Sequence, residues 1–143
     1  MDMSPNGLIH MLQPKTANLA SFDSEELGAT ALTAFFNITA AWGVTAEEER
    51  TLLGSPPRST FFKWKSERIA KLSADTLERI SYVMGIYKAL RILLPTQEAA
   101  NAWVKKPNTA AGFGGKSALQ RMSAGRVIDL ADVRRYLDAE RGW

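Results

Sequence analysis

Residues 45–65 read TAEEERTLLGSPPRSTFFKWK, and this stretch decides the fold. Thr45 and Glu48 have the spacing of a capping box, which predicts the start of a helix. Glycine favours the left-handed conformation that ends helices, so Gly54 is expected to stop this helix after Leu53. A second short helix follows almost at once. Two short helices joined by a tight glycine turn indicate a helix-turn-helix.

The second helix of this motif carries the residue types of a DNA recognition helix. Ser55 is expected to cap it, with Pro56 at its first position. A recognition helix needs donors near its start for base edges and cations around it for phosphates. We therefore predict DNA-binding roles for Arg58, Ser59 and Thr60 at base edges, and for Lys63, Lys65 and Arg68 at phosphates. The alternative is a basic surface helix without a partner.

The flanking segments also predict helices. Asp23 and Glu26 open a helix that Gly43 ends, and Asp75 and Glu78 open a longer one. The apolar residues of the longer helix extend beyond one stripe. That breadth is typical either of burial on two sides within the chain or of a homodimer contact.

The C-terminal part predicts shorter helices around a glycine-rich loop. A helix over 96–105 precedes the loop 108–116, and Ser117 caps the next short helix. The last helix is expected to start at Asp129 or Asp132. No strand ladder or internal repeat is found, so the fold class is all-α.

Together these elements predict four parts along the chain. They are an N-terminal arm (1–22), a helix-turn-helix domain resembling DNA-binding domains (23–72), a long connecting or dimerisation helix (73–95) and a small helical domain (96–143).

Composition excludes several kinds of chemistry. The 143 residues are 45% hydrophobic, contain no cysteine and include one histidine, His10. Disulfides, thiolate nucleophiles and cysteine or multi-histidine metal sites are therefore excluded. No apolar run is long enough for a membrane span, and no signal peptide is evident, so we expect a cytoplasmic protein.

Charge is distributed unevenly along the chain. Residues 1–49 sum to −6, whereas residues 50–71 sum to +5, within a total of +3. A basic block beside an acidic one produces a local field that suits an anionic partner such as DNA.

Two other patterns suggest chemistry but lack its context. Gly112–Ser117 resembles a phosphate-binding loop, yet its glycine spacing is wrong and no strand precedes it. A helix connection in which glycine permits unusual φ is the alternative. The carboxylates Asp129, Asp132, Asp138 and Glu140 have no acid–base partner, so we predict no enzyme, no catalytic residue, no cofactor and no metal site.

The C-terminal half resembles the toxin-binding domain of the MbcA/ParS/Xre antitoxin family. The resemblance rests on Trp103, Pro107-Asn108, the run from Gly112 to Leu119, Gly125 and residues 133–142. Ala118 stands where the family pattern has proline. The Leu52-Leu53-Gly54 and Lys63-Trp64 pattern matches the Xre-like helix-turn-helix of the same family.

The resemblance implies an antitoxin of a type II toxin–antitoxin system. Its partner would be a RES-domain toxin that uses NAD, either by degrading it or by transferring ADP-ribose to a protein. The antitoxin would cover the NAD cleft of this toxin, and the complex would bind its own promoter. We expect the antitoxin to be a homodimer within a toxin–antitoxin hetero-oligomer. A repressor without a toxin partner is the alternative. Either the loop at 111–116 or the C-terminus, ending in an aromatic residue, makes the main contact. The predicted toxin-binding residues are Phe113, Gly114, Lys116, Arg134, Arg135, Asp138, Arg141 and Trp143.

Overall fold

The protein is described by a computed structural model that places residues 24–142. This part of the chain contains seven α-helices, one 3-10 turn and no strand, which confirms the all-α prediction. The helices are α2 (Ser24–Trp42), α3 (Ala46–Leu52), α4 (Arg58–Glu67), α5 (Ala74–Leu93), α6 (Gln97–Ala102), α7 (Ala118–Met122) and α8 (Val127–Glu140), and the 3-10 turn η2 spans Trp103–Lys105. The expectations for 1–22, Asp23, His10 and Trp143 lie outside the described residues.

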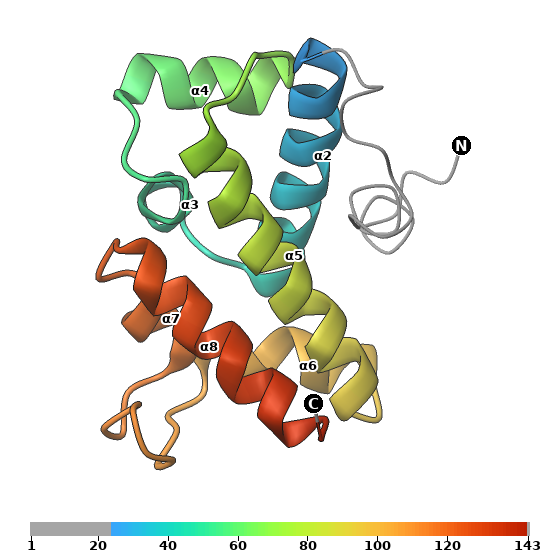
Figure 1. Ribbon diagram of the computed structural model, residues 1–143, viewed down its shortest axis with the longest axis vertical. Helices are drawn as coiled ribbons and strands as arrows, with labels where there is room; N and C mark the ends of the chain where they lie inside the picture. The colour runs from blue at the N-terminus through green and yellow to red at the C-terminus, as the bar shows by residue number, and fades with distance from the viewer. Residues whose placement is uncertain (1–23, 143) are drawn as a thin grey trace.

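Helix α5 runs through the whole molecule and joins its two halves (Figure 1). It packs against α2 in the half that contains α3 and α4, and against α6 and α8 in the other half. Its residues Val83 and Ile86 are fully buried within the chain. The broad apolar surface seen in the sequence is therefore used, at these positions, for intramolecular burial on two sides.

Two glycines allow close approach in the two halves. A Cβ at Gly28 of α2 would overlap the carbonyl oxygen of Ala70, which lies in the segment between α4 and α5. A Cβ at Gly85 of α5 would overlap the guanidinium of Arg134 on α8. The absence of a side chain at Gly85 thus lets Arg134 of α8 approach the backbone of α5.

Most helix ends lie where the sequence placed them. The capping boxes Thr45–Glu48 and Ser117–Gln120 are both present. Gly43 and Gly54 end their helices with φ of 68° and 94°.

Three predicted starts were wrong. The N-cap of α4 is Pro57 rather than Ser55. Helix α5 is capped by Ser73, whose hydroxyl accepts from the amide of Thr76 at 3.1 Å, and not by Asp75. Helix α8 begins at Val127, so neither Asp129 nor Asp132 is its first residue.

No helix in the described range 24–142 is long and apolar enough to cross a membrane.

Candidate functional site

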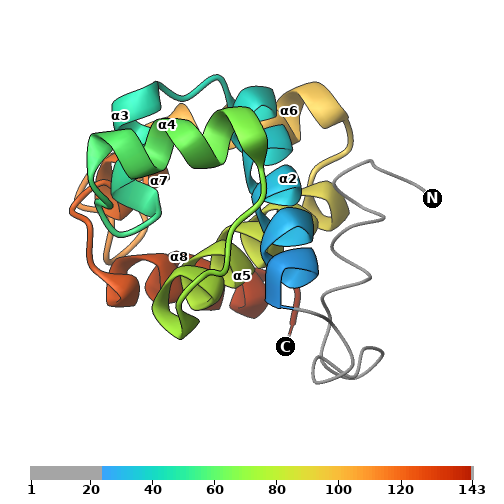
Figure 2. The ribbon, with the colours of Figure 1, turned by 90° about the horizontal axis from the view of Figure 1, so that it is seen from above.

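Helix α4 lies across one end of the molecule, where one long side is free of other helices (Figure 2). Phe61 is its buried anchor, with 1% of its surface exposed. Its ring meets Phe36 of α2 edge-on, with centroids 6.0 Å apart. Fixing Phe61 inward sets the rotation of α4. Ser59, Phe62, Lys63 and Ser66 then face solvent together, whereas Thr60 and Trp64 are half-buried.

The base-edge and phosphate candidates are not equally available. Lys65 donates from Nζ to Oε1 of the buried Glu49 at 2.6 Å, and Thr39 donates to the other oxygen of that carboxylate at 2.5 Å. The Lys65 ammonium also lies 5.8 Å from the centre of the Phe36 ring. A cation that neutralises a buried carboxylate is costly to remove, so Lys65 belongs to the fold.

Arg68 and Arg58 differ in how far the fold holds their side chains. Arg68 is the left-handed residue that ends α4, and its guanidinium covers the Phe36 ring at 5.5 Å. Arg58 is 63% exposed in its side chain and forms an ion pair with Glu47 at 3.3 Å. Exposed ion pairs contribute little, so Arg58 can exchange Glu47 for another anion. Of the six predicted residues, Arg58, Ser59, Lys63 and Lys65 are exposed, but the Lys65 ammonium is held by the buried Glu49.

Sequence reasoning missed Phe62 on this face. Its side chain is 52% exposed. The residue types alone do not show this, because adjacent phenylalanines on one helix can both be buried, as Phe35 and Phe36 of α2 are. Only the rotation of α4 shows that Phe62 faces solvent.

In the other half, the glycine-rich loop is a defined turn. The amide of Asn108 donates to the carbonyl of Lys116 at 3.1 Å, and the amide of Gly115 donates back to the carbonyl of Asn108 at 3.1 Å. Gly112, Gly114 and Gly115 all have positive φ. The Ser117 hydroxyl is buried and caps α7. These features favour the connecting-loop interpretation over a nucleotide-binding one.

Phe113 anchors this loop in the core. It is 5% exposed and packs edge-on against Tyr136 of α8, with ring centroids 5.0 Å apart. Trp103 completes the cluster at 6.3 Å from both rings. Phe113 therefore holds the loop in place, while Gly114 and Lys116 are the predicted toxin-binding residues that the loop exposes.

Two hollows flank the loop on the face that it shares with α8. One has a volume of about 320 Å³ and is lined by Arg121, Asp132, Arg135 and Tyr136 among others. The second, of about 500 Å³, is lined by Lys116, Gln120, Arg121 and Arg126 among others. Phe113 and Gly112 line both.

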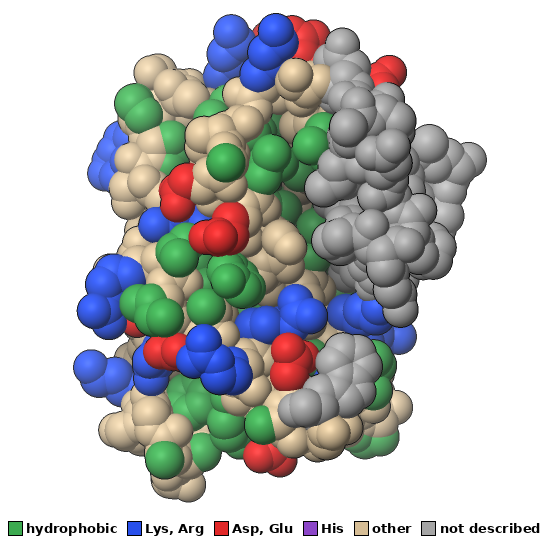
Figure 3. Space-filling model, in the orientation of Figure 1, with side chains coloured by type: hydrophobic (Ala, Val, Ile, Leu, Met, Phe, Trp, Pro, Cys, Tyr) green, Lys and Arg blue, Asp and Glu red, His purple; other side chains and the backbone are tan. Residues whose placement is uncertain are grey.

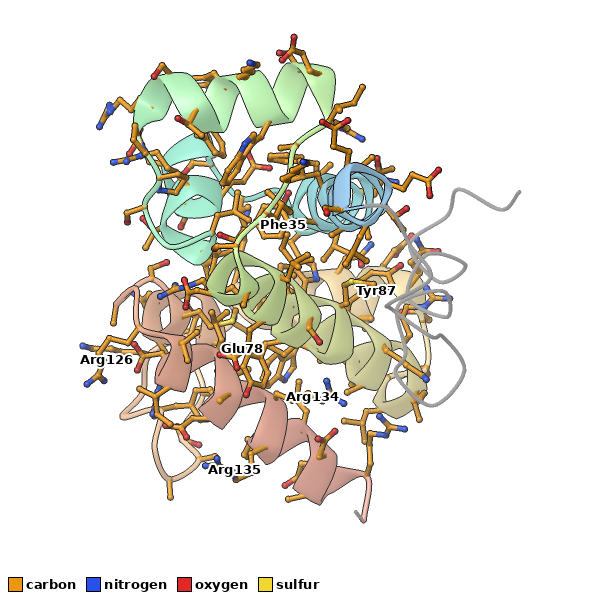
Figure 4. The ribbon with its side chains drawn as sticks, turned by 45° about the horizontal axis from the view of Figure 1, so that its top comes forward. Phe35, Glu78, Tyr87, Arg126, Arg134 and Arg135 are labelled. Carbon is orange, nitrogen blue, oxygen red and sulfur yellow. The ribbon has the colours of Figure 1, made fainter. Side chains whose placement is uncertain are left out.

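The arginines of α8 have different surroundings (Figure 4). Arg134 donates to Asp138 at 3.1 Å on the side that faces Gly85 of α5. Arg141, 7% exposed in its side chain, lies 3.9 Å from Asp138. Arg135 is 73% exposed and pairs with Asp132 at 2.9 Å. Arg134, Asp138 and Arg141 thus hold one another in the fold, and Arg135 faces solvent.

Asp132 and Asp129 organise the cations around the hollows. Arg121 donates to Asp132 at 2.6 Å and also to the carbonyl of Gly112, which ties the loop to α8. Arg126 donates to Asp129 at 2.9 Å. These hydrogen bonds hold the pKa of the Asp129 carboxyl below its ordinary value and raise the pKa of Arg126. Acidic and basic side chains consequently alternate over this half (Figure 3).

Arg79 of α5 connects the two halves. It donates to Asp75 at 3.0 Å and to the carbonyl of Gly125, in the turn between α7 and α8, at 3.0 Å. A Cβ at Gly54, in the turn of the helix-turn-helix, would lie 3.1 Å from the Arg79 Nε. Sequence reasoning did not single out Arg79, because its contact with Gly125 joins residues 46 positions apart in the chain.

Comparison with known proteins assigns both halves to the same class of protein. Residues 21–85 match the antitoxin Xre-like helix-turn-helix domain. Residues 89–142 match the antitoxin Xre/MbcA/ParS C-terminal toxin-binding domain. Such antitoxins are generally not enzymes. Within the described residues, no group of acidic side chains is arranged to hold a metal ion.

The chain also resembles the uncharacterized protein y4oB of Sinorhizobium fredii. The two are 48% identical over 132 residues, which cover 92% of this chain and 99% of that protein. The chain belongs to the antitoxin Xre/MbcA/ParS family. It has a helix-turn-helix domain, which implies DNA, and a toxin-binding domain, which implies a cognate toxin.

Proposed function

We propose that the chain neutralises a RES-domain toxin by covering the NAD-binding cleft of that enzyme, and that it represses its own operon through α4. The family match is the observation that carries the proposal, because its C-terminal domain is a toxin-binding domain. The RES class of the partner follows from the resemblance of the loop and of α8 to this family. Inhibition is steric and needs no chemistry from this chain.

The face formed by the loop and α8 is the proposed toxin contact. Phe113 and the pair of Arg121 with Asp132 fix its shape. Lys116 and Arg135 project from it as exposed cations. Interfaces of this kind use fixed anchors for shape and charges at the rim for orientation. Arg141 is turned back toward Asp138, which favours the loop over the C-terminus as the main contact.

The DNA contact is proposed for the outward side of α4. Arg58 and Lys63 supply charge, and Ser59 lies in the first turn, where recognition helices reach base edges. Lys65 and Arg68 support the helix from behind. We assign the operator contacts to Arg58, Ser59 and Lys63.

Inhibition of the toxin encoded beside this chain tests the proposal. The measurement is NAD consumption by that toxin as the full-length chain is titrated in. The double variant Lys116→Glu with Arg135→Glu reverses both exposed cations and should raise the inhibitory concentration about tenfold. Lys63→Glu on α4 is the matched control, and it should leave inhibition unchanged while weakening promoter binding.

Three results would contradict parts of this proposal. Full inhibition by the double variant would remove the loop face as the contact. Loss of inhibition only after deletion of Arg141–Trp143 would transfer the contact to the C-terminus. Promoter binding by a chain that neither binds nor inhibits the neighbouring gene product would leave a repressor without a toxin.

A further inference from the structure

We propose that Phe62 contacts thymine methyl groups in the major groove of the operator and sets part of its sequence preference. This inference rests on the DNA-binding function proposed above for α4. Thymine is the base that presents a methyl group in the major groove, and apolar side chains such as phenylalanine recognise it by contact.

The first argument is the position of Phe62 on the helix. Residues four apart lie on one face, so Ser59 and Lys63 share the exposed side of α4 with Phe62 and Ser66. This stripe lies opposite Phe61, which is buried against α2. Phe62 is therefore near the middle of the surface that would enter a groove.

The second argument is that the fold makes little use of this side chain. Its ring meets Phe61 edge-on at 5.0 Å and is otherwise about half exposed, at 52%. The large exposed hydrophobic residues of the described chain are Phe62, Ile69, Ile92 and Ile128. Phe62 is the aromatic member of that group and the one on α4. The exposed half of the ring is therefore available for contact with a partner, and an aromatic ring offers a large apolar surface for such a contact.

The third argument selects DNA over a protein as the occupant. Arg58 and Lys63 flank Phe62, and the charge of the stripe is therefore positive. The Arg58–Glu47 pair is exposed on both sides, so a phosphate can replace Glu47. A stable protein contact buries about 800 Å² on each partner around a cluster of apolar residues. One aromatic ring between cations and serines matches a base edge instead.

Replacement of thymine by deoxyuridine tests the proposal, because it removes only the methyl group. Binding of the full-length chain is measured on its own promoter, with each thymine replaced in turn. Loss of one buried methyl group should weaken binding about fourfold at a small number of thymine positions. Phe62→Ala should weaken binding on the normal promoter by a similar factor and should be insensitive to deoxyuridine at those positions.

Two further variants complete the experiment. Ile92→Ala removes an equally exposed apolar side chain at the far end of α5, and it should bind like the unchanged chain on both DNAs. Phe62→Leu keeps an apolar side chain and should retain part of the methyl sensitivity. If Phe62→Ala fails to fold, Phe62→Leu still allows methyl sensitivity to be measured.

The outcomes separate this inference from the proposed function. Undiminished methyl sensitivity in Phe62→Ala and Phe62→Leu would overturn the inference while leaving operator binding in place. The inference would also be overturned if no replacement of thymine by deoxyuridine weakened binding of the unchanged chain. Equal binding of the unchanged chain to its promoter and to unrelated DNA would refute specific operator binding, and the inference would fall with it. If Phe62→Ala changes the oligomeric state, measured as molecular mass in solution, but does not change methyl sensitivity, Phe62 belongs to a contact between copies of the chain.

Discussion

The two halves of the molecule treat their charged residues differently. In the helix-turn-helix half, the buried carboxylate of Glu49 binds Lys65 on the inner side of α4, and the outer side keeps Arg58 and Lys63. In the toxin-binding half, cations and carboxylates pair along α8 itself, as Arg134 does with Asp138. A basic residue on a candidate recognition helix is thus no guide to binding until its partner is known.

The two halves also place their aromatic residues differently. Phe113 lies on an irregular loop but is buried, whereas Phe62 lies on a regular helix but is exposed. A loop without a regular hydrogen-bond ladder needs a side-chain anchor to hold one shape. A helix that Phe61 already anchors can present its next residue to solvent.

Substitution of the two phenylalanines gives the largest expected contrast. Phe113→Ala removes a buried ring between Trp103 and Tyr136 and should lower the free energy of unfolding by about 3–5 kcal/mol. Phe62→Ala should change it by less than about 0.5 kcal/mol, as is usual for surface positions. Urea unfolding of both variants measures the difference. Equal losses would show that Phe62 is part of the core.

The two close-approach glycines give the next contrast. Gly28→Ala forces a methyl group into the backbone at Ala70 and should cost about 3 kcal/mol. Gly85→Ala meets only side-chain atoms at the far end of Arg134, which a change of rotamer can displace. The better helix propensity of alanine partly offsets that displacement, so the cost should stay below about 1 kcal/mol. Thermal unfolding should rank the two variants, and the reverse order would contradict this account.

Removal of the charge on Glu49 should have an intermediate effect. Glu49→Gln leaves Lys65 without its anion and should lower the free energy of unfolding by about 2 kcal/mol. The matched change Glu47→Gln removes the exposed partner of Arg58 and should cost less than about 0.5 kcal/mol. Chemical unfolding of the pair checks the distinction, and equal costs would mean that the Glu49 site is not specially stabilising.

Acid should lower the free energy of unfolding of the toxin-binding half by protonating Asp129. Its pKa is held below the ordinary value of 3.8, mainly by hydrogen bonds from Arg126. This stabilisation is complete above the unfolded pKa and is lost as the pH falls through the lower folded pKa. Asp129→Asn should cost about 1 kcal/mol at pH 7 and less at pH 3. Urea unfolding at both pH values measures this, and a cost that grew in acid would contradict the assignment.

The sequence predicted the helical class and most helix ends because those signals are local. Thr45 and Ser117 act as caps through residues three positions away, which a sequence displays directly. The choice between Ser73 and Asp75 as the cap of α5 is different, since both have suitable spacing. The structure uses Ser73, which caps the amide of the buried Thr76. Burial depends on the tertiary fold, so the local sequence does not show it. Helix α8 starts before Asp129 because that carboxylate accepts from the amide of Arg126 behind it.

The candidate sites were harder to predict than the helices. Contacts such as Glu49 with Thr39 and Lys65, or Arg79 with Gly125, join residues that are distant in sequence. The rotation of α4 depends on Phe36, which lies on another helix. Residue type therefore indicated two candidate surfaces, and tertiary packing decided which of their side chains are exposed. The boundaries drawn at 72/73 and 95/96 stay predictions.

The shared helix α5 fixes the rotation of the two candidate surfaces relative to each other about its axis. The two family matches meet between residues 85 and 89, inside an unbroken helix that extends from Ala74 to Leu93. An α-helix turns by about 100° and advances by about 1.5 Å for each residue. One residue inserted near this junction would therefore swing the toxin-binding half around the helix axis by more than a quarter of a revolution. A chimaera between two relatives must preserve the residue count of α5, whereas the loop at 108–116 can change length without reorienting the helix-turn-helix half.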